Sequence, residues 1–361
     1  MKNIQYLLAL HSIDGLGSVR LKAILDNFKD PKLGWEANGD ELRKIGIPRN
    51  TIEILIETRR NFNPEKYMED IQKSGIKWIT IYDESYPKLL KEIYDPPVIL
   101  YYRGNLDCLN KKCLAVVGTR KMTGYGKAVC EQFVKSLVAF HITIVSGLAR
   151  GIDSKAHETA VFNQGQTVAV LGGGLNKIYP PENISLAKSI IESLGALISE
   201  FPPDYPSLPG NFPSRNRIIS GLSLGVLVVE AAEDSGSLIT ARFALEQGRD
   251  VFAIPGPVTS NLSKGPIQLI KDGAIVVIEP GEILDEIGIF QVQNAKSKVQ
   301  NLENLSEEEK RILEVLENES LHIDEIGRIL RIESAKISSL LLKMEITGLV
   351  QNLGSGKYSR I

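Results

Sequence analysis

The sequence predicts an α/β protein with an extended Rossmann-like, doubly wound and mostly parallel sheet, flanked by an N-terminal helical domain and a C-terminal winged-helix domain. Apolar β-branched runs alternate with helix-length segments between residues 110 and 288. Glycine-punctuated helical spacing precedes this block, and a helix–helix–helix–hairpin order follows it. The 361 residues are enough for two or three domains with a large core.

Residues 1–63 have the pattern of a helix-hairpin-helix or SAM-like domain. A turn at Gly15 and Gly17 precedes apolar residues at helical spacing, and Gly46 with Pro48 begins a weaker copy. Such hairpins can offer free backbone N–H groups to a DNA phosphate. The alternative is a small helical bundle used only for packing, which the absence of a dense basic face favours.

A proline-interrupted connecting segment, residues 64–109, leads into the Rossmann-like block at 110–288. The strands expected there are apolar on both faces, which is typical of a parallel sheet covered by helices on both sides. They are CLAVVG, ITIVSG, TVAVLGGG, ALISE, GVLVVEA, DVFAIPG and AIVVI. Ligands of such sheets bind at the loops leaving the carboxyl ends of the strands.

Residues 289–305 are polar enough for a linker, and residues 306–361 have the element order of a winged helix. From Asn304 onward, eight Lys and Arg stand against ten Asp and Glu. A recognition helix could enter the major groove of duplex DNA. The acidic balance favours a protein contact instead, because phosphate neutralisation supplies much of the affinity for DNA.

Overall charge does not identify a partner, since 42 Lys and Arg nearly balance 44 Asp and Glu. An anionic partner must therefore meet a local basic patch. The three cysteines form no CxxC, which fits a reducing cytoplasm without disulfides. No apolar run reaches the roughly 20 residues of a membrane span. The scattered histidines and the lack of a carboxylate cluster predict no metal and no cofactor.

The predicted strand-end loops are rich in glycine and small polar residues, which allow close approach of a ligand. Three of these loops carry cations: Arg120 with Lys121, then Lys177, then Arg215 with Arg217. Because helix N-termini point at the same rim, we expect these side chains to meet around one anion-binding cavity.

Nucleotide-binding fingerprints are absent. Gly118, Gly124 and Gly126 do not have the spacing of GxGxxG, and Gln351 stands where a P-loop needs its first glycine.

Catalytic arrangements are weak as well. Asp153 and His157 could form a dyad, but Asp153 is better interpreted as a helix cap. Glu233, Asp234 and Ser237 are likewise interpreted as cap and turn residues.

Six motifs in order resemble the DNA processing protein A (DprA/Smf) family across residues 110 to about 280. They are VVGTRKMTGYG, IVSGLARGIDSKAH, VAVLGGGLNKIYPPEN, FPSRNRIISGLS, EAAEDSGSLITARFALEQGRDVFAIPG and SKGPIQLIKDGA. The resemblance implies a non-enzymatic, cytoplasmic bacterial protein that binds and protects single-stranded DNA during natural transformation. It also implies a homodimer formed through the Rossmann-like domain, and delivery of the DNA to the RecA recombinase.

The resemblance also assigns site residues. Arg120 falls on the arginine of the family's G-[ST]-R motif, Arg215 and Arg217 fall on the basic SRNR segment, and Lys177 precedes IYP. The resulting set of expected DNA-binding residues is Gly118, Thr119, Arg120, Lys121, Gly147, Lys177, Asn211, Phe212, Arg215, Asn216, Arg217, Ser235 and Ser237. Arginine suits this role because it grips phosphate and stacks on bases.

Aromatic platforms for stacked bases would complete such a site. The candidates are Tyr125, Tyr179 and Phe212, each of which could instead be a core or lid residue. Ser235 and Ser237 are candidate phosphate donors.

Two other functions remain as alternatives. A nucleotide phosphoribohydrolase would share the sheet and glycine-rich rim, but the equivalent segment here lacks the PGGxGTxxE motif with its glutamate. A transcription factor acting through the winged helix is disfavoured by the acidic tail.

Overall fold

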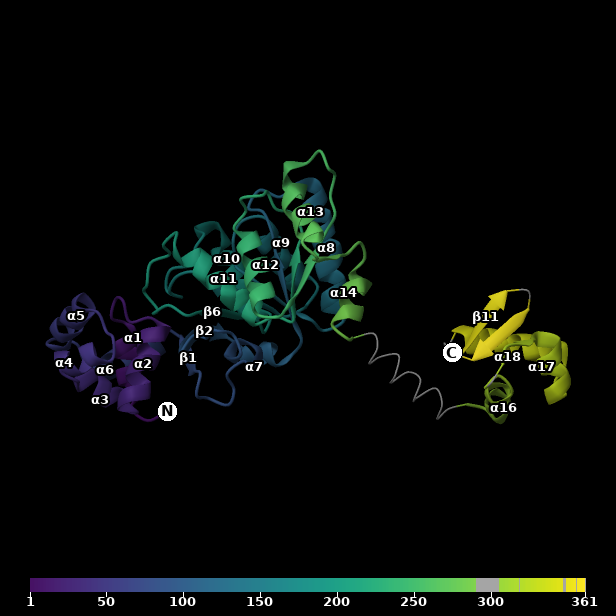
Figure 1. The fold of residues 1–361 in the computed structure, drawn as a ribbon, viewed down its shortest axis with the longest axis horizontal. Helices are drawn as coiled ribbons and strands as arrows, with labels where there is room; N and C mark the ends of the chain where they lie inside the picture. The colour runs from purple at the N-terminus through teal and green to yellow at the C-terminus, as the bar shows by residue number, and fades with distance from the viewer. Residues whose placement is uncertain (290–304, 318, 347–348, 355, 361) are drawn as a thin grey trace. The chain divides into compact units, whose positions relative to one another are not determined.

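The computed structural model describes residues 1–289, 305–317, 319–346, 349–354 and 356–360. The chain divides into two compact units, Met1–Ile283 and Leu284–Ile361. Figure 1 labels the elements along the chain. In the part of the chain that the structure describes, no helix is long and apolar enough to cross a membrane.

A nine-stranded sheet forms the centre of the first unit, in the order β1-β2-β6-β5-β4-β3-β7-β8-β9. Strands β3 to β9 run parallel, whereas β1 and β2 add an antiparallel pair beside β6. The strands are β1 Lys77–Thr80, β2 Ile99–Gly104, β3 Cys113–Val117, β4 Thr143–Ser146, β5 Thr167–Leu171, β6 Ala196–Ser199, β7 Gly225–Val228, β8 Asp250–Ala253 and β9 Ile275–Val276. The predicted doubly wound, mostly parallel sheet is confirmed.

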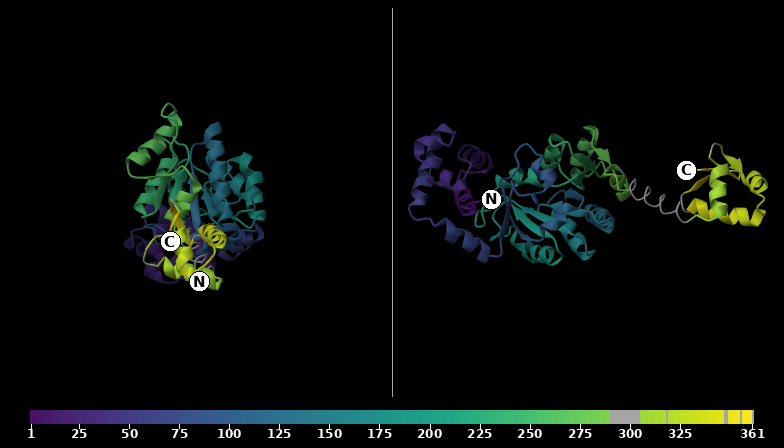
Figure 2. Two further views of the ribbon diagram at one scale, coloured as in Figure 1. Left: turned by 90° about the vertical axis from the view of Figure 1, so that its right-hand side faces the viewer. Right: turned by 90° about the horizontal axis from the view of Figure 1, so that it is seen from below.

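Helices cover both faces of this sheet (Figure 2). Alternate residues of β5 explain why: Val168 and Val170 join the core with α11 and α12, while Ala169 and Leu171 join the core with α10. The helices of the block are α8 Gly124–Ala139, α9 Ile152–Phe162, α10 Ile184–Glu192, α11 Asn211–Gly221, α12 Ser237–Glu246, α13 Lys264–Lys271 and α14 Pro280–Glu286.

The strand order reverses at β3. Strands β4, β5 and β6 follow on one side of it, and the chain then returns through α11 so that β7 pairs with the other side of β3. Loops leaving β3 and β7 therefore diverge toward opposite faces, which opens a crevice at their carboxyl ends.

The N-terminal helices pack beside β2 and β6 (Figure 1). His11 of the first helix stacks on Tyr101 of β2, with ring centroids 5.6 Å apart. The helices are α1 Ile4–His11, α2 Ser18–Phe28, α3 Pro31–Glu36, α4 Gly39–Lys44, α5 Arg49–Arg59, α6 Pro64–Lys73 and the short α7 Lys88–Lys91. The segment expected to be a connection, 64–109, thus extends the sheet by two strands.

The second unit is a winged helix, as predicted. Ile326, Leu341 and Val350 are central to its core, and Ser306 with Glu309 forms a capping box at the start of its first helix. Its elements are α16 Glu307–Val315, β10 Leu321–His322, α17 Ile323–Leu330, α18 Ser334–Ile346, β11 Val350–Gly354 and β12 Lys357–Arg360. The expected linker, 289–305, lies outside the described residues except for its two ends.

Candidate functional site

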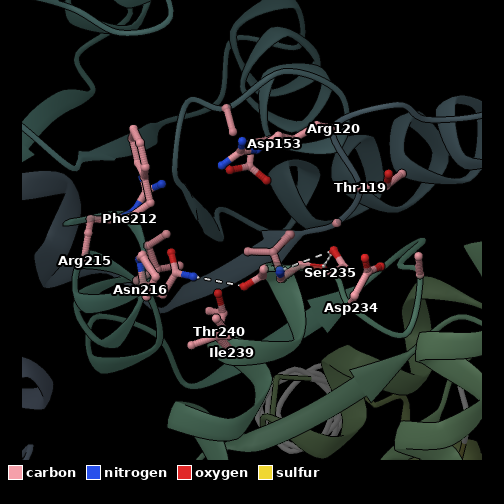
Figure 3. A pocket seen from close by; sticks show the side chains of 18 of the residues that line it. Thr119, Arg120, Asp153, Phe212, Arg215, Asn216, Asp234, Ser235, Ile239 and Thr240 are labelled. Carbon is pink, nitrogen blue, oxygen red and sulfur yellow. Dashed lines mark hydrogen bonds between the residues drawn. The ribbon is translucent and has the colours of Figure 1, made fainter. Parts of the chain in front are cut away.

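A cavity of about 670 Å³ opens at the crevice between the carboxyl ends of β3 and β7. Its walls come mainly from three segments: residues 117–121 after β3, residues 209–219 at the start of α11, and residues 232–240 leading into α12. Figure 3 shows labelled side chains of these segments facing one another. The cavity therefore lies at the position where doubly wound sheets bind ligands.

Arg215 forms part of the cavity floor and is only 4% exposed. Its Nη1 donates to the carbonyl of Gly147 at 2.7 Å and to the carbonyl of Val170. A Cβ at Gly147 would lie 2.3 Å from that Nη1, so the guanidinium packs where only glycine leaves room. Burial lowers the pKa of Arg215 to about 10. Arg215 is thus held in place as a fixed positive charge.

Asp153 lines the cavity beside this arginine. Its carboxylate accepts the Gly147 N–H at 3.1 Å, which ties the loop after β4 to the first turn of α9. Burial raises the pKa of Asp153, against the opposing effect of the Arg215 guanidinium. Asp153 therefore has a structural role, but the interpretation of it as the helix cap is wrong, because Gly151 is the N-cap of α9 and no side chain caps it.

His157 does not act with Asp153. The Thr167 hydroxyl donates to the Ile144 carbonyl at 2.7 Å, so His157 Nδ1–H donates to that hydroxyl, also at 2.7 Å. Burial and the nearby Arg215 lower the pKa of His157 to about 3. The imidazole is therefore neutral and structural.

Arg120 lies at the mouth of the cavity with two aromatic rings. Its guanidinium carbon is 5.7 Å from the centroid of the Phe212 ring. The Phe212 and Tyr179 rings are 5.6 Å apart and inclined by 37°. A cation and two aromatic rings, all lining the cavity, thus come from the loop after β3, the loop after β5 and the first turn of α11.

The loop that carries Arg120 is anchored by its backbone. Thr119 donates its N–H to the carbonyl of Glu230 at 2.7 Å and accepts the Ile152 N–H at 3.1 Å. Gly151 has φ +77°, and a Cβ there would lie 2.2 Å from the Thr119 carbonyl oxygen. The loop after β4 can therefore press against this loop only with glycine at that position.

The opposite wall is polar but not cationic. Asn216 donates its Nδ2–H to the carbonyl of Gly236 at 3.1 Å. The hydroxyls of Ser235 and Ser237 are 2.8 Å apart at the start of α12. Asp234 also lines this wall. The cavity thus combines one cationic and aromatic side with one side of neutral polar groups and the Asp234 carboxylate.

Most of the predicted site residues meet at this cavity. Those that line it are Gly118, Thr119, Arg120, Lys121, Phe212, Arg215, Asn216, Ser235 and Ser237. The candidate platforms Tyr179 and Phe212 also line it, whereas Tyr125 lies outside the lining and donates its hydroxyl to the Pro255 carbonyl at 2.7 Å.

The prediction that Arg217 lines the cavity is wrong. Arg217 is buried on another side of α11, where Nη1 and Nη2 contact the Glu200 carboxylate at 2.8 and 2.7 Å. Its Nε–H also donates to Asp95 at 3.1 Å. Burial alone would lower the pKa of Arg217, but these carboxylates raise it above its ordinary value. Its charge is therefore neutralised within the fold.

Three other predicted residues also lie outside the cavity lining. Lys177 is exposed on the loop after β5. Asn211 begins α11 and donates its side-chain amide to the Pro206 carbonyl at 3.3 Å. Gly147 lies beneath Arg215 and supports it rather than facing the cavity.

Asp153, Ile219 and Thr240 line the cavity although the sequence did not select them as binding residues. Asp153 and Thr240 could have been selected because each lies near a predicted helix start at a strand-end loop. Ile219 gives no such signal, since an apolar residue inside a helix usually belongs to the core. Among the described residues, no group of His, Cys, Asp and Glu could hold a metal.

Fold and site together define a doubly wound α/β protein with a cavity at its switch point that is lined by cationic and aromatic side chains, followed by a winged-helix unit. The chain belongs to the DNA recombination-mediator protein A family, whose model matches residues 77–288. The model of the DprA winged helix domain matches residues 296–356.

Relatives of this family match much of the chain. Protein Smf of Synechocystis is 34% identical over 98% of both chains, and Protein Smf of Escherichia coli is 46% identical over 70% of this chain and 69% of its own. The crystal structure of DprA from Streptococcus pneumoniae is similar with a TM-score of 0.69 and 38% identity, covering 79% of this chain and 99% of that one.

A structure of DprA from Helicobacter pylori, solved to study its binding of single-stranded DNA, is also similar. Its TM-score is 0.53 at 29% identity, covering 58% of this chain and 95% of that one.

Proposed function

We propose that this chain binds single-stranded DNA in the cavity at its switch point and delivers it to a RecA-type recombinase, without catalysing a reaction on it. The observation that carries the proposal is the cluster of Arg120, Phe212 and Tyr179 at the mouth of a cavity that Arg215 also lines. A cationic groove combined with aromatic rings is the usual composition of a single-strand site.

Phosphate and base have separate places in this proposal. The exposed Arg120 and Lys121 on the loop after β3 meet the phosphate, because both are cationic and face solvent. An unpaired base stacks on Phe212 or Tyr179, each such contact contributing about 1–3 kcal/mol. Paired bases of a duplex cannot enter a cavity in this way, so we expect a preference for single strands.

The relatives support this proposal. The family is named for mediating DNA recombination, and DprA of Helicobacter pylori is described by its binding of single-stranded DNA. From the resemblance of its motifs to this family, we also propose a cytoplasmic protein that acts in natural transformation and forms a homodimer through its Rossmann-like domain.

The alternative, a nucleotide phosphoribohydrolase, is less well supported. Asp153 and Asp234 are the carboxylates among the described residues that line the cavity. Asp153 accepts the Gly147 N–H and lies beside Arg215, so it is not placed to activate a water. We therefore expect no release of base or phosphate from nucleoside monophosphates.

Replacing Arg120 tests the site. In fluorescence anisotropy with a labelled oligothymidylate of roughly 20 nucleotides, Arg120→Ala is expected to raise the Kd at least tenfold, because it loses both a phosphate contact and the stack on Phe212. The matched control is Arg60→Ala, which removes an exposed arginine at the end of α5. Equal affinities of the two variants would contradict the proposed site.

A further inference from the structure

The N-terminus of α8 occupies the position at which doubly wound nucleotide-binding sheets hold a phosphate. This helix follows β3, the strand where the order of the sheet reverses. Its free N–H groups and the positive end of its dipole would attract an anion. Thr123 caps it by accepting the Gly126 N–H at 3.1 Å.

A side chain of the protein already fills this position. The Glu230 carboxylate, from the loop that follows the neighbouring β7, accepts the Thr123 N–H through Oε2 at 2.9 Å. Its Oε1 accepts the Thr123 hydroxyl at 2.6 Å. Glu230 is 4% exposed, so an internal negative charge faces the helix N-terminus out of contact with solvent.

Gly126 makes room for this carboxylate. A Cβ at that position would lie 2.0 Å from Oε2 of Glu230. In a dinucleotide-binding turn, a glycine allows the backbone to approach the pyrophosphate. Here Gly126, which has no side chain, leaves space for the Glu230 carboxylate of the protein itself.

The backbone of Glu230 is fixed as well. Its carbonyl accepts the Thr119 N–H at 2.7 Å, and a Cβ at Gly118 would lie 2.8 Å from that carbonyl oxygen. Both the carboxylate and the backbone carbonyl of Glu230 are therefore fixed by hydrogen bonds, to Thr123 and to Thr119. Thr119 belongs to the loop that lines the cavity.

We infer that Glu230 is a built-in anion that closes the phosphate site of this fold, so that nucleotides are excluded from α8 and an external anion is restricted to the side of Arg120 and Lys121. Glu230 is in this sense a specificity-determining residue. The inference does not depend on the nature of the ligand in the cavity, so it stands or falls separately from DNA binding.

Removing the carboxylate tests the inference with inorganic phosphate as the probe. Melting temperatures of Glu230→Ala and the unchanged protein are compared in sodium phosphate and in sodium chloride of equal ionic strength. At a phosphate concentration about ten times its Kd, the variant is expected to gain roughly 2–4 °C more than the unchanged protein. Phosphate should also slow hydrogen exchange in residues 118–126 of the variant.

The matched control is Glu41→Ala. Glu41 likewise accepts a backbone N–H at a helix start, from Asn38 at 2.8 Å, but it is exposed on α4. Equal gains in the unchanged protein, Glu41→Ala and Glu230→Ala would overturn the inference.

If Glu230→Ala does not fold in chloride, its refolding yield is measured by circular dichroism in the two salts. Recovery in phosphate only would support the inference, and equal yields would overturn it.

Discussion

Arg215 and Arg217 lie two positions apart on α11 and have different roles. Residues at i and i+2 of a helix do not share a face, so Arg215 joins the cavity floor while Arg217 contacts Glu200 and Asp95. The sequence presents both as arginines ahead of an apolar run. Only the fold shows that Arg217 forms ion pairs with two carboxylates, whereas Arg215 donates to backbone carbonyls beside Asp153.

Arg217→Met is expected to destabilise the protein strongly, because it leaves the buried Glu200 carboxylate without its partner. Breaking a buried ion pair from one side typically costs about 3–5 kcal/mol. The free energy of unfolding from urea titration measures the loss. The double variant Arg217→Met/Glu200→Met should recover most of it, and a double variant as unstable as the single one would contradict this role.

His157 and His11 make stability depend on pH. Burial lowers the pKa of His11 to about 4 and contributes most to lowering that of His157 to about 3. Unfolded histidines bind protons below about pH 6.5 while these folded ones do not. Burying the two neutral histidines therefore costs no stability above about pH 6.5. The protein loses stability as the pH falls from there toward the pKa values that the histidines have in the folded state.

The free energy of unfolding is therefore expected to fall by about 1.4 kcal/mol per pH unit for each histidine between pH 6 and pH 4. Urea titrations across this range measure the slope. His157→Met, which cannot ionise, should reduce the slope by the share of one histidine. An unchanged slope would show that His157 does not titrate in this way.

At the scale of elements, the parallel strands could be predicted because they are short apolar runs, and β3, β4, β5, β6 and β7 are buried on both faces. The antiparallel edge of the sheet, formed by β1 and β2, could not be predicted. Strands β1 and β2 lie in a segment interrupted by prolines, and their place depends on pairing Tyr101 with Ser199 across a long sequence separation. Local pattern does not encode such a partner.

The contact between α11 and the loop after β4 should depend on Gly147. Gly147→Ala places a Cβ 2.3 Å from Nη1 of Arg215, so we expect a loss of roughly 1–3 kcal/mol through overpacking. Weaker binding of oligothymidylate should follow because α11 carries Phe212 and Asn216. Gly210→Ala is the control, since nothing lies within 4 Å of its Cβ. Equal effects of the two variants, by urea titration and anisotropy, would contradict this account.

At the scale of the whole molecule, the winged helix uses two of its lysines in internal ion pairs. On its helix α18, Lys336 pairs with Glu308 and Lys343 pairs with Glu309 at 2.8 Å. The acidic start of α16 thus neutralises both lysines, which disfavours duplex DNA as a partner.

A chain that ends at residue 289 should therefore keep its affinity for single-stranded DNA within about threefold, since few phosphate contacts would be lost. Anisotropy of the truncated and full chains measures this. A tenfold loss on truncation would show that the second unit takes part in binding.

The location of the cavity could be predicted from the sequence, because ligand sites of doubly wound sheets lie at strand ends and the loops there carry cations. Which of these cations line the cavity could not be predicted from the sequence. Lys177 lies on such a loop but outside the lining, and Arg217 is neutralised by Glu200 and Asp95. Burial and distant partners decide which charge a ligand meets.

The three segments that enclose the cavity are separated by long stretches of chain, at 117–121, 209–219 and 232–240. During synthesis the first of them leaves the ribosome well before the last. A nascent chain therefore has no pocket until α12 has emerged, and proteolytic fragments cut between these segments should lack it as well. The protein can therefore bind a ligand in this cavity only after β3 and β7 have paired in the sheet.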